Sequence, residues 1–448
     1  MTADVATIRP AARLRGEVRL PGDKSISHRA LILATLAAGE SSIVGAGDGA
    51  DVRSTASVMR ALGAIVDRVA SDGRTVDYLV ASPGAAGLTE PLHTLDCGNS
   101  GTSLRLIAGM VAGLPMTCVL DGDESLRRRP VARIIEPLRS MGATLHGRRD
   151  DSLPPLTVVG HTPLRAADIT TPVPSAQVKS AILLAGLQAR GRTTVREAVV
   201  TRDHTERMLR ARGVDVERTE GPDGGVAWTV EGGVSVQAIT EHVPGDPSAA
   251  AFWLVAGAIH PDAELEIRDV GVNPTRRAVI DLLRAMGADI EEHLTGETVG
   301  EAGGAIGEPR ADLTVRTSAL RAIDIGPAEV AAAIDELPIL CLAATQARGT
   351  TTIRGAGELR HKESDRLAGI AAGLSALGAR IEVTGDDVRI EGGTPLHGAT
   401  TDSLDDHRLA MTFAIAGLVA SDLTTIGRPD SAAISYPGFF DDLERVRA

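Results

Sequence analysis

The chain has 448 residues, and a globular chain of this length is expected to divide into two domains of roughly 200 residues each. Hydrophobic residues make up 43% and charged residues 23% of the sequence, which excludes an intrinsically disordered protein. The formal net charge is −13 and only 2% of the residues are aromatic, which argues against a broad surface for nucleic acid or membrane, so cations that bind an anionic ligand must be clustered locally.

The cysteines and the apolar runs indicate in which cellular compartment the protein is expected. Three cysteines, Cys97, Cys118 and Cys341, lie far apart in the sequence, so neither a disulfide framework nor a zinc site is expected. The opening MTADVATIRPAARLRG lacks the hydrophobic core of a signal peptide, and no apolar run approaches the length of a membrane span. We therefore expect a protein of a reducing compartment, the cytoplasm.

The sequence contains six similar segments. In each, an Ala-rich helical stretch ends in a short break and is followed by a β-rich run, as in VAGLPMTCVLDG and LAATQARGTTTIRGAG. The intervals between equivalent alanines are 74, 73, 71, 87 and 73 residues, counted through Ala38, Ala112, Ala185, Ala256, Ala343 and Ala416. A second amphipathic helix follows most of these runs, such as the one in which Leu367, Ile370 and Leu374 share a face.

Six segments predict two domains of three segments each. The internal boundary is expected within EHVPGDPSAA (241–250), and a predicted N-terminal strand stops at Pro21-Gly22. The long fourth interval predicts an insertion at 294–309, which a surface loop would accommodate at a small cost in entropy.

Two stretches of the first half place cations or small residues at a predicted helix start. In LPGDKSISHRAL, a turn leads to Lys24, Ser25 and Arg29, a combination typical of an anion site, although the spacing is not that of a Walker A loop. A serine cap with solvated charges would explain this stretch equally well. In GNSGTS, the small residues around Gly101 leave backbone N–H groups available for an oxyanion.

Further polar groups follow in the first half. Arg129 ends a triplet of arginines before a proline, a pattern that is more often a solvated basic edge. Ser175 and Gln177 stand at the predicted helix start of PSAQVKSA. TRDHTERML then adds Arg202 and His204, and a lone histidine is more often structural than catalytic.

The second half contributes carboxylates as well as cations. Asp335 lies in IDELP, and in RHKESDRL the carboxylate of Glu363 stands between Lys362 and Arg366. Such an arrangement occurs in ordinary ion-pair networks and also in tuned acids beside anionic substrates. Arg408 follows two aspartates in DDHRLAM.

No metal or cofactor is expected. Asp405, Asp406 and His407 would need a second cluster of ligands to hold a metal, and the sequence offers none. It also lacks a Rossmann glycine loop and the signatures of Ser-His-Asp or Cys-His catalysis. Cations in both halves, together with two carboxylates, suit two phosphorylated or carboxylated small substrates and acid–base chemistry.

At these residues the chain resembles the 5-enolpyruvylshikimate-3-phosphate synthase family, and PSAQVKSA and RHKESDR are similar to its second bacterial class. The matches, in order, are LPGDKSISHRAL, GNSGTSLR, RRP, PSAQVKSA, TRDHTE, IDELP, RHKESDRL, DDHRLAM and SYPGFFDDL. The resemblance implies an α/β fold, a two-domain inside-out α/β barrel with three βαβαββ repeats in each domain. It places one domain at 22–243 and the other at 1–21 plus 244–448.

The resemblance also implies a function. Members transfer the enolpyruvyl group of phosphoenolpyruvate to the 5-hydroxyl of shikimate 3-phosphate and release phosphate, in aromatic amino-acid biosynthesis by the shikimate pathway. The implied partners are these two small molecules, without cofactor, metal, nucleic acid or membrane, and the implied protein is a cytoplasmic monomer. Many members are targets of glyphosate, a phosphonate similar to phosphoenolpyruvate.

Residue roles follow from the same resemblance. Shikimate 3-phosphate would be bound by Lys24, Ser25, Arg29, Ser175, Gln177, Arg202, Asp335 and Lys362. Phosphoenolpyruvate would be bound by Lys24, Gly101, Arg129, Gln177, Arg366 and Arg408. Asp335 would take the proton of the 5-hydroxyl and Glu363 would protonate the methylene carbon of phosphoenolpyruvate, with Lys24, which touches both substrates, as the third catalytic residue.

A few positions bear on how far the resemblance extends. Ala176 stands where some members have a second serine, Ile434 where well-known members have a lysine, and His204 where some have tyrosine. Glyphosate-tolerant members of the second bacterial class carry alanine at the position of Gly101, so the glycine predicts a glyphosate-sensitive enzyme.

Other functions are less compatible with the sequence. A UDP-N-acetylglucosamine enolpyruvyl transferase often uses a loop cysteine as its acid, but the arginine-rich stretch 121–133 has none. An RNA 3′-phosphate cyclase, built on related repeats, would need nucleotide and RNA sites, against which the acidic, aromatic-poor composition speaks. A non-catalytic repeat scaffold would not need Asp335 and Glu363 at motif positions.

Overall fold

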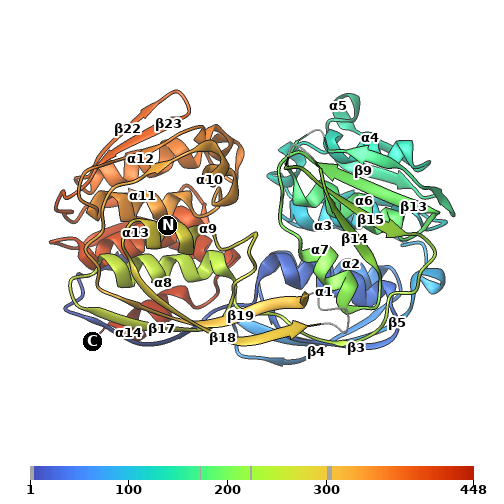
Figure 1. The fold of residues 1–448 in the computed structure, drawn as a ribbon, viewed down its shortest axis with the longest axis horizontal. Coiled ribbons are helices and arrows are strands. Elements are labelled where there is room, and N and C mark those ends of the chain that lie inside the picture. Colours follow the sequence, from blue (N-terminus) through green and yellow to red (C-terminus); the bar gives the residue numbers. More distant parts are fainter. Residues whose placement is uncertain (1–4, 172, 222–223, 300–304, 448) are drawn as a thin grey trace. The chain divides into compact units, whose positions relative to one another are not determined.

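The computed structural model describes residues 5–171, 173–221, 224–299 and 305–447 (Figure 1). The chain forms two compact units. Unit 1 comprises Met1–Pro21, Pro244–Gly296 and Pro309–Ala448, and unit 2 comprises Gly22–Val243 and Glu297–Glu308. The chain therefore crosses between the units in the proline-containing stretches around positions 21 and 244.

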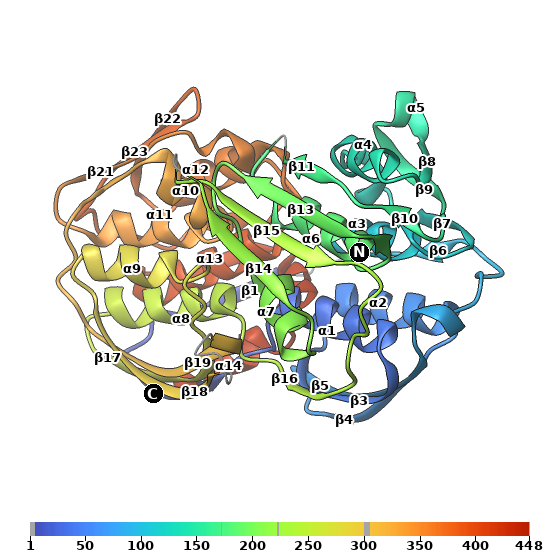
Figure 2. The ribbon, with the colours of Figure 1, turned by 45° about the vertical axis from the view of Figure 1, so that its right-hand side comes forward.

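The interior of unit 2 is built from helices that are apolar on almost every side, and such helices must be buried. They are α1 (Lys24–Leu36), α3 (Gly101–Ala112) and α6 (Ala176–Gly186), and α3 packs against both of the others (Figure 2). Helices with one apolar face lie further out. These are α2 (Ala50–Ala61), α4 (Ala132–Ser140) and α7 (His204–Ala211), and a short α5 spans Arg148–Asp151.

The sheets of unit 2 share one strand order, in which the first strand is parallel to the second and the next pairs are antiparallel. The orders are β16-β3-β5-β4, β6-β7-β9-β8 and β11-β13-β15-β14, with a small β10-β12 pair. The strands are β3 (Ala38–Gly47), β4 (Ile65–Ser71), β5 (Thr75–Pro83), β6 (Leu95–Asp96), β7 (Thr117–Asp121), β8 (Thr144–Gly147), β9 (Leu153–Val159), β10 (Leu164–Arg165), β11 (Asp168–Thr170), β12 (Ala189–Arg190), β13 (Arg192–Glu197), β14 (Val216–Glu220), β15 (Val226–Glu231) and β16 (Thr240–His242). Thr240 of β16 pairs with Ser42 of β3, so residues near the end of the long segment of unit 2 complete its first sheet.

Unit 1 repeats this plan. Its buried helices are α8 (Pro247–Ile259), α11 (Leu337–Gln346) and α13 (His407–Val419), which pack on one another (Figure 1). The outer helices are α9 (Ala278–Ala285), α10 (Pro327–Ala332), α12 (Arg366–Ala376) and α14 (Phe439–Val446). Short 3-10 turns in the two units span Ala85–Gly87, Leu126–Arg128, Ala356–His361 and Pro429–Ile434.

The sheets of unit 1 have the orders β2-β17-β19-β18, β20-β21-β23-β22 and β24-β25-β1. Their strands are β1 (Val5–Ile8), β2 (Leu14–Arg19), β17 (Ala263–Gly271), β18 (Asp289–Val299), β19 (Ala305–Arg316), β20 (Asp324–Ile325), β21 (Thr350–Ile353), β22 (Arg380–Thr384), β23 (Asp387–Glu391), β24 (Thr400–Asp402) and β25 (Thr424–Gly427). In each sheet the first strand is again parallel to the second, as β2 is to β17. The N-terminal strands β1 and β2 complete sheets whose other strands come from the second half of the chain.

The sixfold repeat predicted from the alanine spacing is confirmed. In the described residues each unit holds a core of three buried helices with sheets of one recurring order. The three buried helices of each unit lie inside and the sheets outside, so the predicted inside-out α/β fold is confirmed as well. Local details agree, since Leu367, Ile370 and Leu374 are the buried face of α12, and Gly378 follows this helix with a φ of 95°.

The insertion at 294–309 is not the surface loop that the sequence predicted. Its described residues continue strands β18 and β19, and residues 300–304 lie outside the described part. A Gly- and Glu-rich composition suggests a loop, but β18 and β19 are hydrogen-bonded neighbours in their sheet, and this pairing continues both strands into the insertion. The segment Glu297–Glu308 also groups with unit 2, although the prediction placed all of 244–448 in the second domain.

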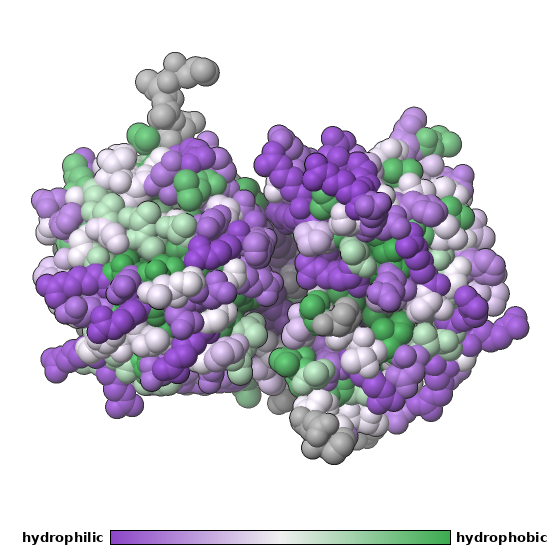
Figure 3. Space-filling view, turned by 90° about the horizontal axis from the view of Figure 1, so that it is seen from above, coloured by the Kyte–Doolittle hydropathy of each residue, from purple (hydrophilic) through white to green (hydrophobic). Residues whose placement is uncertain are grey.

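One face of the molecule is largely polar. On the face shown in Figure 3, hydrophilic residues cover much of each unit, and hydrophobic residues occur singly or in small groups. Among the helices of the described ranges, none is both long enough and apolar enough to cross a membrane.

Candidate active site

The first turn of α1 is fixed by a cap and an ion pair. The Asp23 carboxylate accepts a hydrogen bond from the backbone N–H of Ile26 at 2.9 Å, so the helix begins at Lys24. Lys24 Nζ lies 3.0 Å from Oδ2 of Asp51, which is buried. Burial would raise the pKa of Asp51, but Lys24 and other cations lower it overall, so the pair is ionised at neutral pH. Ser25 follows Lys24 in the same turn.

Arg29, one turn further along α1, is a buried cation with neutral partners. Its guanidinium donates to the hydroxyls of Thr205 and Ser180 at 2.8 and 2.9 Å and to the carbonyl of Ser25 at 2.9 Å. No carboxylate among the described residues lies within ion-pair distance of it, and its exposure is 3%. Burial lowers the pKa of Arg29 to about 10, so it still carries its charge at neutral pH. A buried cation with no carboxylate at ion-pair distance favours an anionic ligand.

A second buried cation, Arg105 of α3, was not identified from the sequence. It donates to Oε1 of Gln177 at 2.5 Å and to the carbonyl of Pro130 at 3.0 Å, again without a carboxylate partner among the described residues. Burial and the charges of nearby arginines lower its pKa to about 9. Its position in the sequence could have identified it, because GNSGTSLR places Arg105 one turn into a helix whose start offers free N–H groups.

Gln177 joins the starts of α3 and α6. Its amide oxygen accepts from Arg105, and its amide nitrogen donates to the hydroxyl of Thr102 at 2.9 Å. Ser175 is the cap of α6, where its hydroxyl accepts from the N–H of Val178. Gly101 is the first residue of α3 and is buried beside Arg105. The structure therefore places Gly101, Ser175 and Gln177 at two neighbouring helix starts.

The three consecutive arginines separate into different environments. Arg127 forms a bidentate pair with Asp121, and Arg128 pairs with Glu124 on the exposed surface. Arg129 instead donates to Oδ1 of Asn99 at 2.5 Å, in the turn that precedes α3. Of the triplet, Arg129 is thus the member that lies beside Gly101, and an added Cβ on that glycine would be 3.7 Å from Arg129 Nη1.

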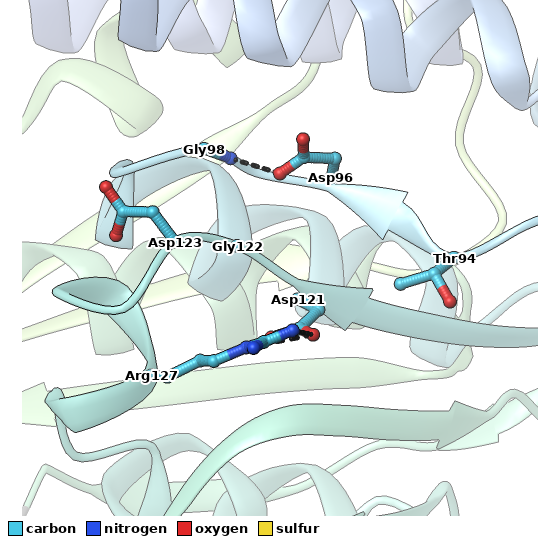
Figure 4. Close-up of a pocket in the computed structure, with 7 residues that line it drawn as sticks. All are labelled: Thr94, Asp96, Gly98, Asp121, Gly122, Asp123 and Arg127. Carbon is cyan, nitrogen blue, oxygen red and sulfur yellow. Dashed lines mark hydrogen bonds and ion pairs between the residues drawn. The ribbon is translucent and has the colours of Figure 1, made fainter.

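A hollow of about 440 Å³ adjoins Arg127 of this triplet, and its lining does not suit an anion (Figure 4). It is lined by Thr94, Asp96, Gly98, Asp121, Gly122, Asp123 and Arg127. Arg127 is already paired with Asp121, and Asp96 accepts from the N–H of Gly98 at 2.8 Å. The remaining carboxylates would repel an anionic substrate.

Arg202 lies two residues before α7, and His204 is the first residue of this helix. Arg202 is close enough to Arg29 that its charge contributes to the lowered pKa of Arg29. His204 is 1% exposed, and its Nδ1 lies 2.7 Å from Oε1 of Glu308. The residue after it, Thr205, is a hydrogen-bond partner of Arg29. The start of α7 therefore belongs to the region around Arg29.

In unit 1, both predicted carboxylates lie close to Arg366. The buried guanidinium lies 2.5 Å from Glu363 and 2.8 Å from Asp406, and 3.6 Å from Asp335. Burial would lower the pKa of Arg366, but Glu363, Asp406 and Asp335 raise it overall. Lys362 Nζ also lies 3.6 Å from Oδ1 of Asp335. The side chains of Asp335 and Glu363 remain 21% and 27% exposed, so a ligand can reach both.

Arg408 belongs to a second network of unit 1. Its guanidinium lies 3.7 Å from Oε1 of Glu336, a buried carboxylate that also accepts from the hydroxyl of Ser248. Arg276 donates to Ser248 at 2.8 Å and to Asp246 at 3.2 Å. The sequence prediction missed Glu336 and Arg276. Their signal was weak, because a glutamate next to Asp335 and an arginine in VNPTRRAV have no distinctive spacing.

The residues considered as metal ligands have other partners. Asp405 pairs with Arg428, and Asp406 caps α13 and binds Arg366. His407 is buried, and burial lowers its pKa to about 4, so it is neutral. In the residues that the structure describes, no group of three His, Cys, Asp or Glu side chains could hold a metal ion.

Comparisons with known proteins identify the family of the chain. The family model described as EPSP synthase (3-phosphoshikimate 1-carboxyvinyltransferase) matches residues 8–443. Proteins named 3-phosphoshikimate 1-carboxyvinyltransferase from Gloeobacter violaceus and Geobacter metallireducens are 52% and 46% identical, over 98% and 99% of both chains. A solved EPSP synthase from Acinetobacter baumannii has a TM-score of 0.87 at 38% identity and covers 100% of this chain and 98% of its own. The enolpyruvyl transferase NikO from Streptomyces tendae is similar in fold, with a TM-score of 0.77 at 21% identity over 99% of this chain and 98% of its own.

Proposed function

The chain belongs to the EPSP synthase family, and we propose that the side chains described above perform the reaction of this family in the shikimate pathway. That reaction transfers the enolpyruvyl group of phosphoenolpyruvate to the 5-hydroxyl of shikimate 3-phosphate and releases phosphate. The observation that carries the residue assignments is the pair of buried cations, Arg29 and Arg105, whose described hydrogen-bond partners are all neutral. Both substrates are anions, and they would supply the missing counter-charge.

We assign shikimate 3-phosphate to the region around Arg29 in unit 2. The residues proposed to bind it there are Lys24, Ser25, Arg29, Ser175, Gln177 and Arg202, with Asp335 and Lys362 contributed by unit 1. The support is that Arg29, Ser180 and Thr205 form one hydrogen-bonded group next to the first turn of α1, with Arg202 nearby. Charged donors of this kind bind phosphate and carboxylate oxygens strongly.

We assign phosphoenolpyruvate to the starts of α1, α3 and α6, with two cations from unit 1. The proposed residues are Lys24, Gly101, Arg129, Gln177, Arg366 and Arg408. Gly101 allows an anion to approach the N–H groups at the start of α3, because it has no Cβ. Arg105 would strengthen the positive potential there, although its own donors are engaged with Gln177 and Pro130.

The chemistry is assigned to the carboxylates of unit 1. Asp335 accepts the proton of the 5-hydroxyl, whose oxygen bonds to the C2 atom of phosphoenolpyruvate, while Glu363 delivers a proton to C3. The resulting tetrahedral intermediate then loses phosphate, which leaves with the proton that Asp335 took up, while a proton of the methyl carbon returns to Glu363 and the enolpyruvyl double bond is restored. Arg366 favours the ionised form of Glu363, so the partly exposed acid must be desolvated by bound substrate in order to hold its proton. The cations stabilise the charges that develop, and Lys24 is shared by both substrates.

We also propose the wider organisation of the enzyme. Residues 22–243 are the first enolpyruvyl transferase domain, and 1–21 with 244–448 are the second, with Glu297–Glu308 contributed to the first. The protein is proposed to act as a cytoplasmic monomer without nucleic-acid or membrane partners. The net charge of −13 and the three unpaired, buried cysteines are consistent with this proposal.

A phosphate-release assay tests the function directly. The purified protein is expected to release phosphate from phosphoenolpyruvate when shikimate 3-phosphate is present and not when UDP-N-acetylglucosamine replaces it. Exhaustive chelation is expected to leave the rate unchanged, since no metal cluster occurs in the described residues. Preference for the nucleotide sugar, or loss of the rate with chelator, would contradict the proposal.

Gly101→Ala is expected to weaken glyphosate inhibition roughly 5- to 150-fold. The added Cβ would lie 2.8 Å from Arg105 Nη1, which is too close, and 3.7 Å from Arg129 Nη1. Arg105 is held by Gln177 and Pro130 and cannot move freely, so the methyl narrows the phosphoenolpyruvate region and the KM for phosphoenolpyruvate rises by a smaller factor. Inhibition titrations on both proteins measure the change.

A remote glycine provides the control for this variant. Gly221→Ala places a Cβ at an ordinary contact distance of 3.4 Å and is expected to leave inhibition unchanged. A wild-type enzyme that is already indifferent to millimolar glyphosate would contradict the argument from Gly101. It would instead point to Ile434 as the source of tolerance.

A further inference from the structure

The β18–β19 hairpin is longer than its counterpart in the next sheet. β18 and β19 have 11 and 12 residues, whereas β22 and β23 have 5 each. The extra residues account for the interval of 87 between Ala256 and Ala343, against 71 to 74 elsewhere. Residues Glu297–Glu308 group with unit 2, while the rest of the hairpin belongs to unit 1. The extension of the hairpin therefore belongs to unit 2, although it lies in the second half of the chain.

Glu308, at the end of this segment, has a specific contact in unit 2. Its carboxylate Oε1 lies 2.7 Å from Nδ1 of His204, and the two side chains are 5% and 1% exposed. An ionised carboxylate only accepts hydrogen bonds, so Nδ1 carries the proton. The other ring nitrogen, Nε2, is buried and has no hydrogen-bond partner among the described residues. A buried polar atom of this kind needs an explanation.

The pair lies next to the region assigned to shikimate 3-phosphate. His204 is the first residue of α7, and the hydroxyl of the next residue, Thr205, accepts from Arg29 at 2.8 Å. The same hydroxyl bonds Ser180 at 2.7 Å, which in turn accepts from Arg29. The charge of Glu308 also acts on Arg29, where it favours the cation. Glu308 and His204 therefore border the hydrogen-bonded group that holds the buried cation.

We propose that Glu308 is a positioning residue for shikimate 3-phosphate, which it serves by holding Nδ1 of His204 so that Nε2 is presented to the anionic substrate. This inference rests on the proposed function. With Nδ1 donating to Glu308, Nε2 is the ring nitrogen left to accept a hydrogen bond from a hydroxyl of the substrate, and the Glu308 carboxylate fixes the ring from the opposite side. Nε2 thereby gains the partner that the described residues do not provide.

Steady-state kinetics of the full-length enzyme test this role. Glu308→Ala is expected to raise the KM for shikimate 3-phosphate about 10-fold, while kcat and the KM for phosphoenolpyruvate stay within about 2-fold. Glu308→Gln should raise it less, because an amide oxygen still accepts the Nδ1–H but carries no charge. Glu291→Gln is the matched control, because Glu291 is an exposed carboxylate of the same hairpin that pairs with Arg316, and it should leave every constant unchanged.

A double-mutant cycle separates positioning from a structural effect. In a His204→Phe background, Glu308→Ala is expected to cause no further rise in the KM for shikimate 3-phosphate. In ¹⁵N spectra of histidine-labelled wild-type enzyme, adding shikimate 3-phosphate should shift the Nε2 resonance of His204. The Gln variant and this resonance decide the question if the Ala variant does not fold.

Three results would overturn the inference. They are an unchanged KM in both Glu308 variants, an equal rise in the His204→Phe background, and an Nε2 resonance that does not respond to shikimate 3-phosphate. Each presupposes a wild-type enzyme that turns over shikimate 3-phosphate. A wild type without that turnover would instead refute the proposed function, so the two failures are distinguishable.

Discussion

Replacing either proposed catalytic carboxylate is expected to lower kcat roughly 10²–10⁴-fold, the range found for general acids and bases. Asp335→Asn removes the acceptor of the 5-hydroxyl proton, and Glu363→Gln removes the acid that protonates C3. Both amides preserve the size of the side chain, so the KM of each substrate should change far less than kcat. Initial-rate measurements at saturating concentrations of both substrates give the comparison.

The neighbouring Glu358 provides a matched control for this experiment. Like Asp335, it lies 3.6 Å from Lys362 Nζ, but its side chain is 70% exposed, whereas that of Asp335 is 21% exposed. Glu358→Gln therefore removes a comparable ion pair without touching the proposed chemistry, and its kcat should stay near that of the wild type. Near wild-type turnover in both Asp335→Asn and Glu363→Gln would refute their assignment as acid and base.

Lys179→Met is expected to lower the free energy of unfolding by about 3–5 kcal/mol, the usual cost of leaving buried charges without their partner. Lys179 Nζ lies 2.7 Å from Glu197 and 2.8 Å from Glu206, and all three side chains are fully buried in unit 2. Removing the ammonium leaves two carboxylates in a low-dielectric interior. Urea unfolding at neutral pH measures the loss.

The same cluster makes this loss depend on pH. Burial raises the pKa of Glu206 above its value in an unfolded chain, an effect that Lys179 reduces only in part. A carboxyl group with a raised pKa in the folded state favours folding at low pH, and this contribution disappears as the pH rises through the folded value. Without Lys179 the pKa of Glu206 should rise further, so the destabilisation of Lys179→Met should be larger at pH 8 than at pH 5.

An exposed pair in the same unit provides the comparison. Arg192 and Glu217 form an ion pair with side chains that are 60% and 50% exposed, so Arg192→Met should cost at most about 1 kcal/mol. Combining Lys179→Met with Glu206→Gln should recover part of the lost stability, because one of the stranded charges is removed. Equal losses for Lys179→Met and Arg192→Met would show that the buried cluster does not stabilise unit 2 as its geometry implies.

The sequence by itself determined the repeat, the helix starts and most of the candidate residues. The spacing of Ala112, Ala185 and Ala256 exposed the repeat because each period places one buried helix at the same point of the pattern. Ser175 could be placed at a helix start because capping involves residues only three positions apart. Gly378 could be placed at a helix end for the same reason, since the left-handed conformation is a local preference of glycine.

Only the tertiary structure decided which polar residues share an environment. Arg105 became a candidate because it bonds Gln177, 72 positions away, and His204 because Glu308 reaches it from 104 positions away. The sequence also could not show that Arg127 and Arg129 lie in different environments. Arg127 pairs with Asp121 and Arg129 bonds Asn99, and both partners lie outside the triplet. Burial and ion pairing depend on side chains that meet only when distant segments pack, and neither periodicity nor spacing records which segments those are.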